Sequence, residues 1–288
     1  MILGMFNSTR LISIRPMSFD MKSSYAAIAT ALLRGITDEI AYSAQARSGT
    51  ESLPELIDRV REVSKGAQEQ MKEALATAFP DIGWNNSEDK QDSPADAALY
   101  WVYDPIDGAY HYLQGLPLWS SSLALVKDGQ AILALVYDPC HHELVAAEVG
   151  RGTTLNGQPV SASAKTELRA AVVGTALPPF GSVAPIEHAH AARLLVEASK
   201  HVFVTRQMAA ASLQLAYVAM GRLDAYLETG EDVYDWMAGC LLVQEAGGIA
   251  TSLKGVPFNA SAQGVLAAAA GLHSRLHNSL IDVIDADS

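Results

Sequence analysis

The sequence predicts an α+β or α/β fold in which helices and two sheets are stacked in layers. Two helical patterns precede any strand, residues 99–160 carry strand patterns joined by hairpin turns, and strand and helix patterns alternate after residue 170. The chain has 288 residues, of which 49% are hydrophobic, so it is long enough to bury a substantial core.

The two N-terminal helices are indicated by spacing and by their start signals. Apolar residues recur every three or four positions through residues 25–46, which places them on one helix face. A second helix follows Ser52 with Pro54 in its first turn, where proline is tolerated because the backbone amide has no partner there. We expect residues 1–21 to form a flexible N-terminal extension.

Strands dominate the next part of the chain, and two dipeptides set their pairing. Asp128-Gly129 and Asn156-Gly157 lie between apolar runs and are typical of tight antiparallel hairpins. Hairpin-joined strands before residue 160 and alternating strands and helices after residue 170 predict two halves. The N-terminal half is α+β and covers 22–165, and the C-terminal half is α/β and covers 166–288. The expected strands are Ala98–Tyr103, Ser121–Lys127, Ala131–Tyr137, Glu143–Val149, Ala171–Thr175, His201–Thr205, Asp224–Glu228, Ile249–Ser252 and Val265–Ala269.

Charge and composition exclude several classes of function. A net charge of −12 argues against sequence-independent binding to nucleic acid, which requires a basic surface. No run is long and apolar enough to span a membrane, and the first 20 residues lack a clear signal peptide. Cys140 and Cys240 are too few for a disulfide framework, so we expect reduced thiols. We therefore expect a cytoplasmic protein with no nucleic-acid or membrane partner.

The most informative segment is the run Trp101–Gly108, which places Asp104 and Asp107 three positions apart after a strand-like stretch. Pro105 cannot donate to a sheet and has a fixed φ, so we expect it to end the strand and hold both carboxylates on a stiff turn. Two fixed carboxylates are half of a magnesium site. An ordinary Asp-Pro turn, with Asp and Gly chosen for their backbone preferences, explains this segment alone equally well.

A second acidic signal lies far along the chain, at Asp235. It stands at the start of a helical pattern that ends at Gly247-Gly248. A carboxylate at a helix start can simply cap free amides and interact with the helix dipole, which is common. The two acidic segments together indicate a metal site much more specifically than either one does alone.

The chain resembles the inositol monophosphatase family over about residues 22–285. The resemblance rests on D-P-I-D-G-A at Asp104 and on Y-D-W-M-A-G at Asp235, followed by an E-A-G-G helix end, in the family's order. It implies the layered αβαβα sandwich of the inositol monophosphatase and fructose-1,6-bisphosphatase type. It also implies a homodimer and a Mg²⁺-dependent, lithium-sensitive phosphatase that hydrolyses inositol monophosphate or a related polyol or sugar phosphate.

The resemblance also implies a set of metal ligands. Asp104 bridges two ions, the carbonyl of Ile106 joins the first, and Asp107 with Asp235 holds the second. Two or three Mg²⁺ ions are expected, with Mn²⁺ as a substitute, because hard cations prefer oxygen ligands. Such ions offset charge repulsion, lower the pKa of the attacking water and stabilise the leaving alkoxide.

A further ligand is expected upstream, where the family has G-E-E. This chain has Ser87-Glu88-Asp89 at that place, and we assign Glu88, with Asp89 as the fallback. The surrounding loop is polar, so a solvated acidic side chain is the alternative. Glu88, Asp104 and Asp107 are the expected catalytic residues.

Four positions are assigned to the substrate by resemblance. The amides of Gly108 and Ala109, at the start of a short helix through Tyr112, receive phosphate oxygens. Glu228 accepts hydrogen bonds from polyol hydroxyls, and Asp235 also faces the substrate.

Two departures from the family pattern concern proton transfer. The usual threonine after D-P-I-D-G is Ala109, and its upstream aspartate partner has no counterpart near Ser64. A positioned general base is worth about a hundred- to ten-thousand-fold in rate. One alternative is therefore a catalytically weakened member that binds metal and an anionic ligand. A separate alternative, which does not depend on these departures, is another sugar or nucleotide phosphatase of the superfamily. His111 stands where the family has asparagine, and a role as a surface or hydrogen-bonding residue is favoured for it over base or ligand.

Overall fold

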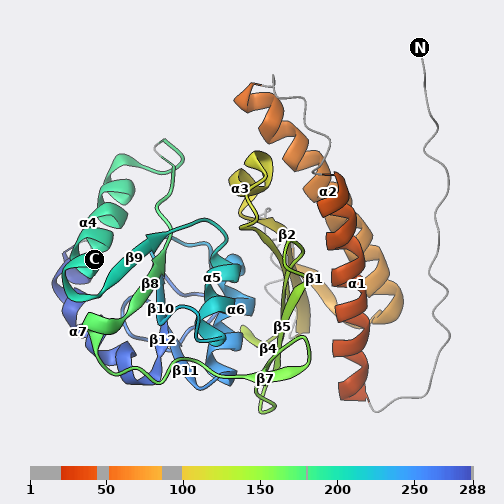
Figure 1. Ribbon diagram of the computed structural model, residues 1–288. Coiled ribbons are helices and arrows are strands. Elements are labelled where there is room, and N and C mark those ends of the chain that lie inside the picture. Colours follow the sequence, from red (N-terminus) through yellow and green to blue (C-terminus); the bar gives the residue numbers. More distant parts are fainter. Residues whose placement is uncertain (1–20, 44–51, 86–98, 180, 287–288) are drawn as a thin grey trace.

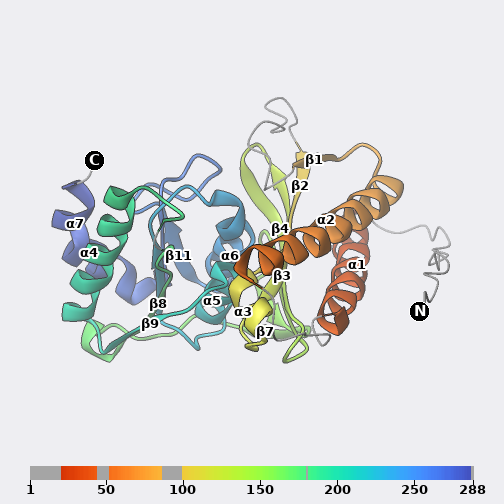
Figure 2. The same ribbon diagram turned by 90° about the horizontal axis from the view of Figure 1, so that it is seen from above.

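The computed structural model describes residues 21–43, 52–85, 99–179 and 181–286 and shows five layers. Two helices cover one face of a seven-stranded sheet, and two more separate it from a five-stranded sheet (Figure 1). A last pair of helices covers the far face of the second sheet, as the view from above shows (Figure 2). This arrangement confirms the expected layered sandwich. No helix in the described ranges has the length and apolarity needed to cross a membrane.

The outer pair, α1 (Met21–Ser43) and α2 (Leu53–Ala78), buries one apolar face against the seven-stranded sheet. Leu33 and Met71 are fully buried in this contact. Ser52 caps α2, and its amide donates to the Glu55 carboxylate at 2.7 Å in a capping box. The helix expected after Ser52 is therefore confirmed with its start signal.

The seven strands of the first sheet are hydrogen-bonded in chain order. β1 and β2 are parallel, and all other neighbours are antiparallel. Asp128 and Asn156 both have φ of 49°, and each is followed by a glycine of positive φ, as tight hairpin turns require. The strands are β1 (Gly83–Asn85), β2 (Leu99–Asp107), β3 (Ser120–Lys127), β4 (Gln130–Asp138), β5 (Glu143–Glu148), β6 (Thr153–Leu155) and β7 (Gln158–Val160).

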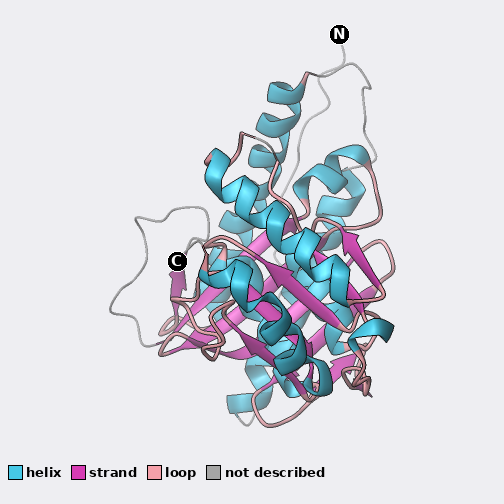
Figure 3. Cartoon of the chain, turned by 90° about the vertical axis from the view of Figure 1, so that its left-hand side faces the viewer, coloured by secondary structure: helices cyan, strands magenta, loops and turns pink. Residues whose placement is uncertain are grey.

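The second sheet has the order β11-β12-β10-β8-β9, with β10, β8 and β9 parallel and β12 antiparallel to its neighbours. Figure 3, seen from the side of α4 and α7, shows helices lying across the strands behind them. The strands are β8 (Val172–Thr175), β9 (Val204–Gln207), β10 (Ala225–Glu228), β11 (Gly248–Thr251) and β12 (Val265–Ala269). The remaining helices are α3 (Ala109–Gln114), η1 (Leu168–Ala170), α4 (Pro185–His201), α5 (Ala211–Ala219), α6 (Val233–Glu245) and α7 (Ala270–Asp285).

Two expected strand boundaries differ from the structure by three residues or more. His201 is the last residue of α4, so the strand expected at 201–205 begins later, at Val204. Pro105 does not end β2: the ladder skips Pro105 and Ile106 and resumes where Asp107 pairs with Ser120. The two halves expected at 22–165 and 166–288 each contain one sheet, and their division at residue 165 stays a prediction.

The middle layer, α5 and α6, connects the two sheets. Side chains from both sheets and both helices form one apolar cluster, in which Trp236 and Tyr226 are fully buried. Gly239 lets the helices approach closely, because a Cβ placed there would lie 2.4 Å from Cβ of Leu215. Tight packing fixes the start of α6 relative to the end of β2, and the candidate site lies where they meet.

Candidate metal centre

The structure brings together three of the acidic residues singled out in the sequence. Asp104 and Asp107 lie at the end of β2, and Asp235 lies in the first turn of α6. One carboxylate oxygen from each lies within 4.8 Å of the other two. Asp107 is buried, and the other two are partly buried. This is the one group of three or more potential metal ligands in the described part of the chain.

The irregular end of β2 gives the first two carboxylates their positions. Oδ1 of Asp104 accepts the amide of Ile106 at 3.0 Å, which closes a tight local turn. The carbonyl of Pro105 accepts the hydroxyl of Ser121 at 2.5 Å from the neighbouring strand. These contacts take the place of the β2–β3 ladder hydrogen bonds, which are interrupted at Pro105 and Ile106.

Asp107 also caps the N-terminus of α5, a contact that the sequence did not indicate. Its Oδ1 accepts the amide of Ala211 at 3.2 Å, and its Oδ2 accepts both the amide and the hydroxyl of Ser212. The only local signal was the serine at a helix start, and nothing in it indicates a partner about a hundred residues earlier.

The convergence of three carboxylates is unfavourable without a counter-charge. Burial raises the pKa of Asp235 well above its usual range, and the negative charges of Asp104 and Asp107 raise it further. Burial also raises the pKa of Asp107, although hydrogen bonds from Ser212 and Ala211 oppose the shift. Grouped carboxylate oxygens without sulfur or imidazole fit a hard divalent cation such as Mg²⁺ or Mn²⁺.

Glu228 lies at the end of β10, next to the cluster. Its Oε2 accepts the Tyr226 hydroxyl at 2.5 Å and the Trp236 indole N–H at 2.7 Å, and Trp236 directly follows Asp235. Burial raises the pKa of Glu228 to about 7. A cavity of about 690 Å³ adjoins this residue, between the N-terminal end of α4 and the loop before α6.

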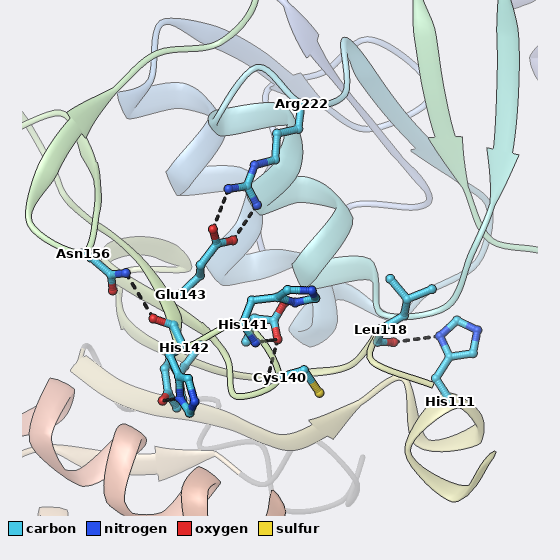
Figure 4. A network of polar contacts seen from close by, with 10 residues as sticks. His111, Leu118, Cys140, His141, His142, Glu143, Asn156 and Arg222 are labelled. Carbon is cyan, nitrogen blue, oxygen red and sulfur yellow. Dashed lines mark hydrogen bonds and ion pairs between the residues drawn. The ribbon is translucent and has the colours of Figure 1, made fainter. Parts of the chain in front are cut away.

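Gly108 and Ala109 directly follow the second carboxylate. Gly108 has φ of 90° and precedes α3, and a Cβ at this position would lie 3.0 Å from the carbonyl oxygen of Leu118. His111 Nδ1 donates to that same carbonyl at 2.7 Å (Figure 4). The histidine therefore has the hydrogen-bonding role that the sequence favoured, and Ala109 offers only a methyl group.

Glu88 and its fallback Asp89 lie outside the described residues. The last described residue before them is Asn85, whose amide Nδ2 donates to the Tyr234 hydroxyl at 2.9 Å. Tyr234 precedes Asp235, so β1 ends beside the helix turn that carries the third carboxylate.

Comparison with known proteins agrees with this geometry. The model of the inositol monophosphatase family, a phosphatase family, matches residues 21–286. The chain belongs to the inositol monophosphatase family. It is 36% identical over 202 residues to an inositol-1-monophosphatase from Rhizobium meliloti, a match that covers 69% of this chain and 73% of the relative. A Nus factor SuhB from Xylella fastidiosa is 35% identical over 69% of this chain and 70% of its own length.

Solved structures of the family have the same fold. The IMPase of Thermotoga maritima superimposes with a TM-score of 0.77 over 92% of this chain and 100% of its own, at 24% identity. The suhB protein of Bartonella henselae gives a TM-score of 0.74 at 26% identity, covering 88% and 99% of the two chains. The expected fold type is thereby confirmed.

Proposed function

We propose that this protein hydrolyses a small phosphomonoester, of which inositol monophosphate or a related polyol or sugar phosphate fits best, in a Mg²⁺-dependent reaction. The observation that carries the proposal is the approach of three carboxylates to within 4.8 Å at the junction of β2 and α6. Membership of a phosphatase family and the name of the Rhizobium relative support the same reaction class.

Asp104, Asp107 and Asp235 would hold the cations, with the Ile106 carbonyl and Glu88 completing the ligand set. Bound cations would neutralise phosphate charge, acidify the attacking water and stabilise the departing alkoxide. Asn85, the last described residue before Glu88, donates to the hydroxyl of Tyr234, which directly precedes Asp235.

The chain's own groups would bind and orient the substrate. The amides of Gly108 and Ala109, at the start of α3, would receive phosphate oxygens. Oε2 of Glu228 accepts both of the hydrogen bonds to this carboxylate, and Oε1 has no hydrogen-bonding partner among the described residues. That oxygen would accept a hydroxyl of the polyol. Asp235 would also contact the substrate.

Ala109 supports a second candidate function. Without the hydroxyl that the family uses at this position, the chain would bind metal and an anionic ligand but hydrolyse slowly. A homodimer, a cytoplasmic location and the absence of nucleic-acid and membrane partners stay predictions.

Phosphate release from a panel of inositol, sugar and nucleotide phosphates tests these proposals. We expect turnover with Mg²⁺ or Mn²⁺, none with EDTA, inhibition by Li⁺, and loss of activity in Asp104→Asn. Asp58→Asn, on the exposed side of α2, is the matched control. Magnesium binding without phosphate release from any substrate would favour the second candidate function. Phosphate release that is unchanged by EDTA would overturn the metal-dependent mechanism.

A further inference from the structure

The Ser212 side chain donates its hydrogen bond to a single carboxylate, that of Asp107. Ser212 is 0% exposed, and its amide and hydroxyl both donate to Oδ2 of Asp107, at 2.6 and 2.5 Å. A buried hydroxyl of this kind cannot reach a substrate. Any effect that it has on the reaction must pass through Asp107.

A second hydroxyl lies directly behind the first. Oγ of Ser120 is 3.0 Å from Oγ of Ser212, and Ser120 is also 0% exposed. Ser212 gives its only hydroxyl proton to the carboxylate of Asp107, so Ser120 donates to Ser212. Successive hydrogen bonds of this kind polarise and strengthen one another in a buried setting.

The hydrogen bonds on Asp107 leave little of the carboxylate available. An ionised carboxylate offers about four acceptor positions on its two oxygens. Ser212 fills two of them on Oδ2, and the amide of Ala211 fills one on Oδ1. The remaining position is on Oδ1.

We propose that Ser212, supported by Ser120, is a positioning residue that restricts Asp107 to presenting Oδ1 alone to a divalent cation. The inference rests on the proposed function, because it takes Asp107 as a ligand. A locked carboxylate binds a cation without first losing rotational freedom, and hydrogen-bonding partners of metal ligands typically change metal affinity about ten- to a hundredfold.

Thr153 provides a matched control. Its hydroxyl is also buried, at 2% exposure of the residue, and donates to the carbonyl of Leu242 at 2.7 Å. Leu242 lies seven residues beyond Asp235 on α6, about 10 Å along the helix axis. Removal of this hydroxyl should affect stability without affecting the cluster.

The test is Mn²⁺ titration of metal-stripped full-length protein, with free Mn²⁺ measured by electron paramagnetic resonance. We expect Ser212→Ala to weaken Mn²⁺ binding by at least about tenfold and Thr153→Val to leave it within about twofold. Ser120→Ala keeps the bond between Ser212 and Asp107 and should cause a smaller loss. It also provides the readout if Ser212→Ala does not fold, as judged by circular dichroism.

The possible results separate this inference from the proposed function. If the wild type binds Mn²⁺ and neither serine variant changes its affinity, the positioning role is wrong while the metal site stands. If Thr153→Val weakens binding as much as Ser212→Ala, the effect is one of general stability and the inference is also wrong. Equal Mn²⁺ binding by wild type and Asp104→Asn would overturn the proposed metal site itself.

Discussion

Replacing Asp235 with asparagine should stabilise the metal-free protein and weaken its response to magnesium. In the wild type, oxygens of Asp235, Asp104 and Asp107 lie within 4.8 Å of one another. Two unit charges at that distance repel by about 3.5 kcal/mol at an effective dielectric constant of 20. Asparagine keeps the size of the side chain and removes both repulsions.

Proton uptake limits how much of this repulsion the folded protein experiences. Burial and the negative charges of Asp104 and Asp107 raise the pKa of Asp235 well above its usual range, so the charged form of Asp235 is disfavoured in the metal-free protein. Its place in the first turn of α6 favours the charged form by about 1 kcal/mol. We therefore expect Asp235→Asn to raise the free energy of unfolding at pH 7 by about 2–3 kcal/mol.

Urea unfolding in EDTA and in excess MgCl₂ measures both effects. The free energy of unfolding of the wild type should rise by about 2.7 kcal/mol when Mg²⁺ is at a hundred times its Kd, and that of the variant should rise much less. The stability difference between the two proteins should therefore become smaller or change sign. Asp58→Asn should change neither value. A lower stability of Asp235→Asn than of wild type in EDTA, or an equal gain of both proteins from Mg²⁺, would refute the predicted repulsion.

Three further predictions test other parts of the structure. The pKa of Glu228 is raised from 4.5 to about 7, so its contribution to stability is fully present below pH 4.5 and is lost as the pH rises through 7. Glu228→Gln should therefore gain up to about 3 kcal/mol over wild type between pH 5 and 8 in EDTA; a difference that does not vary with pH would contradict this. Gly239→Ala should lower the free energy of unfolding by about 1–3 kcal/mol because the added methyl group clashes with Leu215. Gly66→Ala, which has open space around it, should raise the free energy of unfolding by about 0.5–1 kcal/mol. Equal effects of the two substitutions in urea unfolding would argue against tight packing of α5 and α6. Ala109→Thr should raise the rate of phosphate release about tenfold if proton transfer limits it, and an unchanged rate would mean that another base or another step is limiting.

The sequence was sufficient to predict the layers and the residues at their junction. Hairpin dipeptides and helical spacing are local signals, and the structure confirms the turns that they predicted. Asp104, Asp107 and Asp235 were singled out because a short acidic motif and a helix-start acid occur together in one chain, and the structure places them side by side.

The details that escaped prediction depend on contacts between distant segments. β2 continues past Pro105 because the ladder resumes at Ser120, which no local rule for proline anticipates. The capping of α5 by Asp107 joins elements from two different layers. The roles assigned to Gly108 and Glu228 stay predictions.

The two sides of the carboxylate cluster are synthesised at different times. A nascent chain that has emerged only through the first sheet carries Asp104 and Asp107 but not α6, so it lacks the third oxygen donor. High-affinity capture of a divalent ion would then mark the moment at which the middle layer docks. Ion-dependent resistance to proteolysis should accordingly be a property of the finished polypeptide and not of its N-terminal fragments.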